Sequence, residues 1–310
     1  MSGARPALWW IGSTAPVELA EAYGDLCAWE GQRPGTVRTF NTAAEAIATL
    51  ADSALANSAA PELMLLAESR PGELAHAEVA TLQQQAPLTR QVALLGSLCE
   101  GEQRTGRPWP GVVRYYWHQW PWRLKPQLAR WLRLRDATAV DEAQPPFPWE
   151  LPLTATEDER CLSAVGRTGA GQVRDGLIAV AGTDAAMVQT LVGLCRQVGW
   201  NAAAWTTTDC MTPQSPIAEQ SEGSRGWYPG VAAGVWDVYG PLDANLPQLV
   251  DFAAHLAPAP VVAVVNFPRW NEVLALRQAG VAAVVSKPLY QGDLAAALAA
   301  CAFPREACEV

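Results

Sequence analysis

The sequence has little lysine, no cysteine pairing motif and no long apolar run. Only two of its 22 Lys and Arg residues are lysines, Lys125 and Lys287. Its seven cysteines form no Cys-x-x-Cys pair and no even framework, which favours free thiols in a reducing cytoplasm over disulfides or a zinc site. No apolar run reaches the roughly 18 residues of a membrane span. The apolar start at 7–11 is too short for a signal-peptide core. We therefore expect a cytoplasmic protein without a membrane segment.

Acidic residues outnumber basic ones, and the net charge is −9. This net negative charge disfavours binding of nucleic acid by the chain as a whole. The charge is distributed unevenly along the chain, because residues 103–135 contain eight basic residues and no acidic one. With 50% hydrophobic and 17% charged residues, the composition is that of a globular protein.

The length of 310 residues and the composition along the chain predict two domains joined by a linker. The expected bounds are 1–135 for the first domain, 136–175 for the linker and 176–310 for the second domain. The linker is rich in proline and glycine. Its glycines Gly166, Gly169 and Gly171 precede a strand, whereas a dinucleotide-binding loop must follow one.

Short apolar runs alternate with amphipathic segments in both predicted domains. This alternation predicts parallel sheets covered by helices on both faces. The predicted strands of the first domain are 7–11, 63–67, 92–96 and 112–116, and those of the second are 177–181, 202–205, 233–238, 261–265 and 283–286.

The two domains also match in spacing, which predicts a duplicated domain. The alternative is that small α/β domains simply have elements of similar length. Three pairs of anchors share the same offset in residue number, namely Gly12 and Gly182, Ala67 and Asp237, and Pro71 and Pro241. In a fourth pair, Val112 and Val281, the offset is shorter by one.

Ligands of parallel α/β sheets bind at the carboxyl ends of the strands. In the second domain the residues at these ends are Gly182-Thr183, Asp237, Asn266 and Lys287-Pro288. The sequence Asp237-Val238-Tyr239-Gly240-Pro241, followed some fifty residues later by Lys287-Pro288, resembles the receiver domain of two-component response regulators. The resemblance covers about residues 175–303.

The resemblance implies two flavodoxin-like, three-layer α/β/α domains in tandem, each with a parallel five-stranded sheet. It also implies that Asp237 stands at the phospho-acceptor position and Lys287 at the position of the family's lysine. Receivers hold Mg²⁺ with an acidic pair after the first strand. Here Ala181, Gly182 and Thr183 stand in that place, and Asp184 is better placed to cap the following helix.

Other departures from the receiver pattern are a missing switch Ser/Thr, since Val265-Asn266 stands there, and a first domain with Ala67 at the acceptor position. His118 falls opposite Lys287 in the repeat. Asp237 and Lys287 are then either a phosphorylatable site without its usual metal ligands or a retained ion pair. The loss of the acidic pair favours the ion pair.

Residues 115–123 interleave aromatic side chains with arginine. Such a stretch can form a protein-binding hot spot, pack within the chain, or stack on unpaired bases. Three tryptophans do not fit the helical period of a core face, so we expect a partner-binding surface made of Trp117, Trp120, Trp122 and Arg123. By resemblance, residues 112–135 and 271–301 are candidate interaction surfaces.

The resulting hypothesis is a non-catalytic pseudo-receiver that acts in signalling or scaffolding through a protein partner or self-association. It is not expected to be an enzyme or to need a cofactor. One alternative is an active phospho-receiver that uses Asp237 with Mg²⁺, and another is a protein that binds a nucleotide or small metabolite. His76 and His255 are expected to be surface or helix-packing residues.

Overall fold

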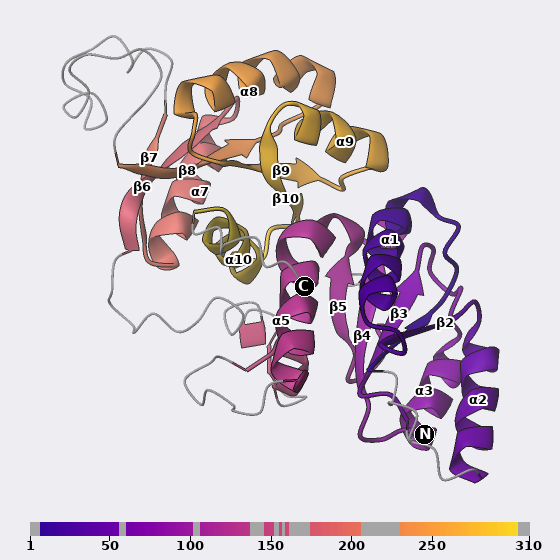
Figure 1. The fold of residues 1–310 in the computed structure, drawn as a ribbon. Helices are drawn as coiled ribbons and strands as arrows, with labels where there is room; N and C mark the ends of the chain where they lie inside the picture. The colour runs from indigo at the N-terminus through magenta and orange to yellow at the C-terminus, as the bar shows by residue number, and fades with distance from the viewer. Residues whose placement is uncertain are drawn as a thin grey trace. The chain divides into compact units, whose positions relative to one another are not determined.

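The computed structural model describes residues 7–55, 60–101, 106–136, 146–151, 155–156, 159–160, 174–205 and 230–302. These residues form two compact units, each built around its own sheet (Figure 1). No helix among them is long and apolar enough to cross a membrane.

The first domain has a parallel five-stranded sheet in the order β2-β1-β3-β4-β5. Its strands are β1 (Leu8–Ile11), β2 (Val37–Phe40), β3 (Leu63–Glu68), β4 (Arg90–Leu95) and β5 (Val113–Tyr116). The helices are α1 (Val17–Gln32), α2 (Ala43–Leu55), α3 (His76–Gln85) and α5 (Lys125–Asp136).

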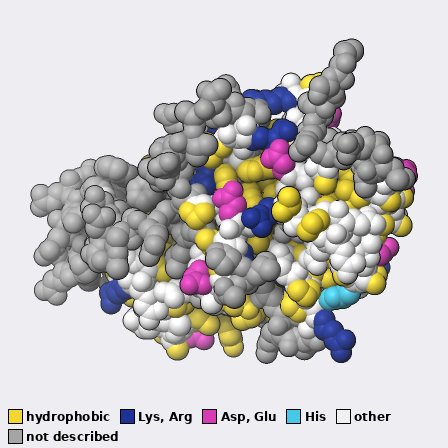
Figure 2. All heavy atoms as spheres, turned by 90° about the horizontal axis from the view of Figure 1, so that it is seen from below, with side chains coloured by type: hydrophobic (Ala, Val, Ile, Leu, Met, Phe, Trp, Pro, Cys, Tyr) yellow, Lys and Arg dark blue, Asp and Glu magenta, His cyan; other side chains and the backbone are white. Residues whose placement is uncertain are grey.

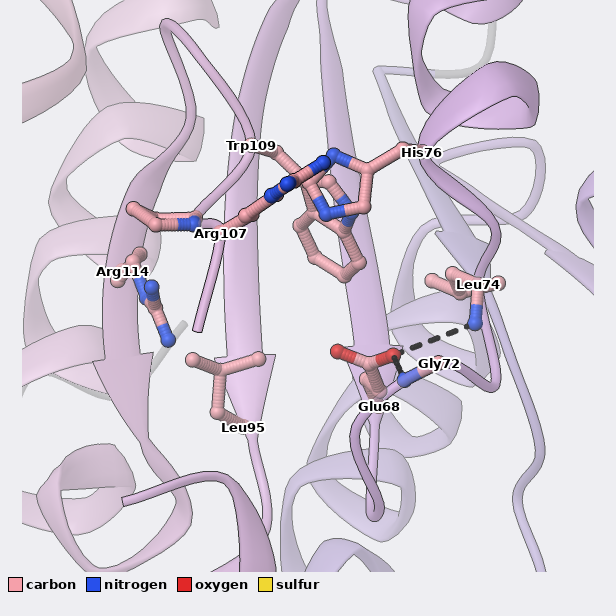
Figure 3. Close-up of a pocket in the computed structure, with 9 residues that line it drawn as sticks. Glu68, Gly72, Leu74, His76, Leu95, Arg107, Trp109 and Arg114 are labelled. Carbon is pink, nitrogen blue, oxygen red and sulfur yellow. Dashed lines mark hydrogen bonds between the residues drawn. The ribbon is translucent and has the colours of Figure 1, made fainter. Parts of the chain in front are cut away.

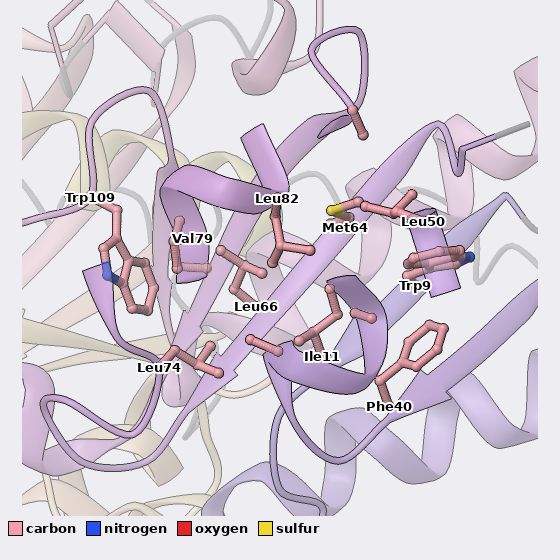
Figure 4. Close-up of a cluster of buried hydrophobic side chains, with 14 of the residues drawn as sticks. Trp9, Ile11, Phe40, Leu50, Met64, Leu66, Leu74, Val79, Leu82 and Trp109 are labelled. Atoms are coloured by element: carbon pink, nitrogen blue, oxygen red, sulfur yellow. The ribbon is translucent and has the colours of Figure 1, made fainter. Parts of the chain in front are cut away.

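Side chains on the two faces of this sheet pack against different helices, because successive strand residues point to opposite faces. On one face Ile11 and Leu66 join Leu50 of α2 and Leu82 of α3 in a buried cluster (Figure 4). On the other face Trp10 packs against Tyr23 of α1, with the ring centroids 5.5 Å apart.

The second domain repeats this topology, with the strand order β7-β6-β8-β9-β10 and all pairs parallel. Its strands are β6 (Arg174–Gly182), β7 (Trp200–Ala204), β8 (Val231–Asp237), β9 (Val261–Asn266) and β10 (Val281–Lys287). The helices are α7 (Ala185–Gln197), α8 (Leu242–Leu256), α9 (Trp270–Gln278) and α10 (Gln291–Ala302). Both domains are flavodoxin-like, so the predicted fold class is confirmed.

Strand β2 of the first domain was not among the predicted strands. It is an edge strand, and Phe40 is its only buried residue. Because an edge strand with one buried side chain needs no apolar run, the sequence carries little signal for it.

Most of the predicted linker, including Gly166, Gly169 and Gly171, lies outside the described residues, as do residues 206–229. Within the linker, however, Pro148–Glu150 forms a 3₁₀ turn, η4, that belongs to the first compact unit. Phe147 and Trp149 of this turn are buried. Residues 147–150 of the predicted linker therefore pack with the first compact unit, and the bounds of the linker stay a prediction.

Sheet register relates the two domains position by position. Ala67 pairs with Leu94 and Leu94 with Tyr115, while Asp237 pairs with Val264 and Val264 with Val285. In residue number, Val264 follows Leu94 by the same offset that separates Ala67 from Asp237, and Val285 follows Tyr115 by that offset too. The one shorter offset, between Val112 and Val281, has a structural cause. Strand β10 carries an irregularity between Val281 and Ala283 that adds one residue.

This bulge corrects one predicted correspondence. Beyond the bulge the common offset returns. Ser286 pairs with Val265 as Tyr116 pairs with Leu95, so Ser286 matches Tyr116. The next residue, Lys287, therefore matches Trp117. His118 does not stand at the lysine position, because the offset that separates it from Lys287 holds only before the bulge.

Candidate functional site

Asp237 ends β8, the central strand of the second sheet, and its side chain is fully buried. Parallel pairing places Gly182 of β6 beside it on one side and Val264 of β9 on the other. The carboxylate is thus enclosed at the carboxyl end of the sheet, where a parallel α/β fold presents its functional groups.

Lys287, at the end of β10, reaches Asp237 from the edge of the sheet. Its Nζ lies 2.6 Å from Asp237 Oδ1 and donates a hydrogen bond to the carbonyl oxygen of Val238 at 3.1 Å. The lysine side chain keeps 17% of its surface exposed, whereas the aspartate side chain has none. The structure therefore brings the two predicted site residues together as an ion pair.

The second carboxylate oxygen of Asp237 has no hydrogen-bond partner among the described residues. Such an atom is costly to bury, because it has lost its contacts with water without replacement. The ammonium of Lys287 is therefore the group that compensates the buried charge.

The loop after β8 is fixed by Asn245 of α8, a buried residue whose Nδ2 donates to the carbonyl oxygens of Tyr239 and Pro241 at 2.8 and 2.9 Å. These bonds hold Tyr239 and Gly240 in the turn that follows Asp237. Sequence reasoning missed Asn245, because an Asn in the first turns of a helix usually points to solvent.

Asp184 caps α7, as predicted. Its Oδ1 accepts hydrogen bonds from the backbone N–H groups of Ala186 and Met187 at 2.9 and 3.1 Å. This oxygen is committed to the helix terminus. Gly182 and Thr183, which precede it, have no carboxylate, and the residues present do not fit the acidic cradle of a receiver's Mg²⁺. Nor does any group of three His, Cys, Asp or Glu residues gather for metal binding in the described ranges.

In the first domain the same end of the sheet is filled by a side chain from α1. Glu18 accepts hydrogen bonds from the backbone N–H and the hydroxyl of Ser97, at 3.1 and 3.0 Å. Gly96 makes room for this, because a Cβ at residue 96 would collide with the Glu18 carboxylate. With Ala67 at the acceptor position, this edge has no nucleophile equivalent to Asp237.

A small cavity lies on the α3 side of the first sheet, lined by Glu68, His76, Arg107, Trp109 and Arg114 among others (Figure 3). Glu68 Oε1 accepts from the backbone N–H groups of Gly72 and Leu74 at 2.8 and 3.3 Å. The cavity volume is about 20 Å³, which is room for a water molecule and not for a metabolite.

The aromatic stretch is packed within the chain, which corrects the predicted partner-binding surface. Trp117, Trp120, Trp122 and Arg123 are 2%, 1%, 8% and 3% exposed. A 3₁₀ turn at Trp117–Gln119 and a π turn at Trp120–Leu124 replace the regular helical period on which the prediction rested.

Two contacts show how this stretch is held inside the first domain. Trp120 donates from Nε1 to Asp25 Oδ2 of α1 at 2.8 Å, and Lys125 Nζ lies 2.8 Å from Oδ1 of the same aspartate. The Arg123 guanidinium lies 4.8 Å from the centre of the Tyr115 ring. Packing inside the chain was one of the alternatives left open.

The three histidines serve different packing roles. His118 is buried, and its Nε2 lies 3.2 Å from Oε1 of the equally buried Glu100. His76 meets Trp109 edge to face at 6.3 Å, and His255 on the exposed side of α8 lies 3.4 Å from Asp251.

Comparisons with known proteins leave the family of the chain open. No family model and no curated protein matches it. Two similar solved structures are described as "GsuK Channel" and "Crystal structure of the GsuK bound to ADP". They are 13% and 14% identical, cover 97% and 94% of this chain and 70% and 68% of their own, and superpose with TM-scores of 0.26 and 0.25. Likeness at this level carries no argument about function.

Proposed function

We propose that this chain is a non-catalytic, receiver-like protein that works in signalling or scaffolding through contacts with other proteins. The observation that carries the proposal is the state of Asp237, which is fully buried and lies 2.6 Å from the Lys287 ammonium. A carboxylate in this state is part of the packing at the carboxyl end of the sheet and is not presented to a phosphoryl donor.

The chemistry of phosphoryl transfer supports this proposal. A carboxylate that attacks a phosphoryl group needs a nearby cation to neutralise the charge that both carry. Gly182 and Thr183 stand where metal-binding acids are needed, and Asp184 is engaged at the terminus of α7. Lys287 is the positive group that contacts Asp237, and it also donates to the Val238 carbonyl.

Exposed aromatic residues at the strand ends of the second domain favour a protein partner. Tyr239 follows β8 and is 64% exposed, and Phe267 follows β9 and is 41% exposed. Phe267 has a φ of +47°, an uncommon value for a bulky residue and one that is often found at functional positions. Within 271–301, α9 exposes Leu274, whereas α10 is buried from Gly292 to Leu298.

Charge argues against nucleic acid as the partner. On the face shown in Figure 2, acidic side chains lie beside the Lys and Arg side chains of the described residues. Together with the net charge of −9, this disfavours phosphate-backbone binding, which depends on clustered cations.

Incubation with acetyl phosphate and Mg²⁺, followed by intact mass spectrometry, tests the proposal. We expect the wild type to keep its mass, as should the Asp237→Asn variant. A gain of one phosphoryl group by the wild type that is lost in Asp237→Asn would overturn the proposal in favour of an active phospho-receiver. Native mass spectrometry of the same sample would reveal a retained nucleotide or metabolite. Such a ligand would favour the alternative of a protein that binds a nucleotide or small metabolite.

A further inference from the structure

A short piece of the chain that lies between the two sheets in the sequence packs on the first domain. Residues 146–151 belong to the first compact unit, although α5 ends at Asp136 and β6 begins only at Arg174. We call residues 146–151 the clip. Its turn η4 lies against β4.

The clip is held through its two aromatic side chains. Phe147 and Trp149 are 5% and 4% exposed, and their rings stack nearly parallel with centroids 5.0 Å apart. The guanidinium of Arg130, on α5, lies 4.0 Å from the centre of the Phe147 ring, a close cation–π contact. The receiving surface thus includes the Arg130 side of α5.

The docked clip also has hydrogen bonds of its own. Glu150 accepts a hydrogen bond from the Phe147 N–H through its carboxylate and donates its own N–H to the Phe147 carbonyl, both at 2.9 Å. Pro148 lies between them with a fixed φ. These bonds and the proline restrict the conformations of the docked turn.

We propose that the Arg130 side of α5 is a docking site for a Pro-Phe-Pro-Trp segment, and that the chain supplies this ligand itself in residues 146–149.

Chymotrypsin tests the docking, because it cuts after tryptophan and Trp149 is buried only while the clip is bound. We expect the Trp149–Glu150 bond of the folded wild type to be cut slowly. Arg130→Ala should raise that rate by at least about tenfold, since cleavage follows the population of the open form. Arg133→Ala, a loss of the same charge on the same helix, is the matched control and should leave the rate unchanged.

A second variant keeps the test decisive if Arg130→Ala disturbs α5. Phe147→Ala removes the ring that Arg130 contacts, leaves α5 intact, and should also speed cleavage after Trp149. Circular dichroism verifies that each variant is folded. Docking is overturned if the folded wild type is cut at Trp149 as fast as urea-unfolded protein, or if both variants leave the rate unchanged.

Discussion

Gly182 and Asp237 face each other across the β6–β8 ladder so closely that no side chain fits between them. A Cβ at residue 182 would lie 2.8 Å from the Cβ of Asp237 and 3.1 Å from its carbonyl oxygen. Residue 182 is also one of the positions where a receiver's metal-binding acids would stand. An acidic side chain at residue 182 would therefore have to displace Asp237 from its buried position.

The first prediction is that Gly182→Ala destabilises the second domain. The added methyl group must push β6 away from β8, and overpacking of this kind costs about 1–3 kcal/mol. Urea unfolding followed by circular dichroism measures the loss. Gly193→Ala is the matched control, because a Cβ there meets nothing within 4 Å and the residue lies inside α7. That variant should gain up to about 1 kcal/mol, and equal losses in both variants would contradict the steric explanation.

The second prediction concerns the ion pair at the end of β8. Lys287→Met leaves the buried Asp237 carboxylate without a compensating charge, and removal of one member of a buried pair costs about 3–5 kcal/mol. The double variant Lys287→Met/Asp237→Asn removes the charge as well and should recover most of the loss. Urea unfolding of both variants measures the two values. If Lys287→Met unfolds at the same urea concentration as the wild type, the ion pair does not stabilise the carboxyl end of the sheet.

The sequence predicted the regular part of the fold because it is periodic. Nine of the ten strands were expected from apolar runs, and the exception, β2, buries only Phe40. Asp237 and Lys287 end strands β8 and β10, and the carboxyl ends of parallel strands lie at the same end of a sheet, so their proximity could be expected from the sequence.

The errors arose where local geometry departs from a regular period. The bulge at Val281–Ala283 moves the lysine position from His118 to Trp117. The 3₁₀ and π turns turn Trp117, Trp120 and Trp122 inward, although no helical stripe includes them. Phe147 and Trp149 lie in a proline-rich stretch whose composition is that of a linker, and only their tertiary contacts with α5 and β4 order it.

The third prediction follows from the burial of the tryptophans. Trp120→Ala removes a fully packed ring and the hydrogen bond to Asp25, and large-to-small changes of this kind cost about 3–5 kcal/mol. We therefore expect the first domain to unfold at much lower urea concentration. Tyr239→Ala, at a mostly exposed aromatic, should change stability by no more than about 0.5 kcal/mol. A Trp120→Ala protein as stable as Tyr239→Ala would restore the hypothesis of an exposed tryptophan surface.

The fourth prediction concerns thiol reactivity. Burial raises the pKa of the Cys195 thiol and of the Cys301 thiol to about 12, so few of these groups are thiolates at pH 8. Cys27 on α1 is exposed. Brief treatment with iodoacetamide, followed by peptide mass spectrometry, should label Cys27 well before Cys195 and Cys301. Equal labelling of all three in the folded protein would show that the two helices α7 and α10 open readily.

The same pKa shifts predict a loss of stability at high pH. The folded protein keeps its proton on Cys195 up to a pKa of about 12, whereas the unfolded chain releases it near its ordinary value of 9.0. Between these values the unfolded state binds fewer protons, so the free energy of unfolding falls as the pH rises. Cys195→Ala lacks this contribution. The stability advantage of the wild type over Cys195→Ala, measured by urea unfolding at pH 8 and pH 10.5, should therefore shrink at the higher pH. An advantage that grows with pH would mean that the thiolate, not the thiol, is the form that the core of the second domain favours.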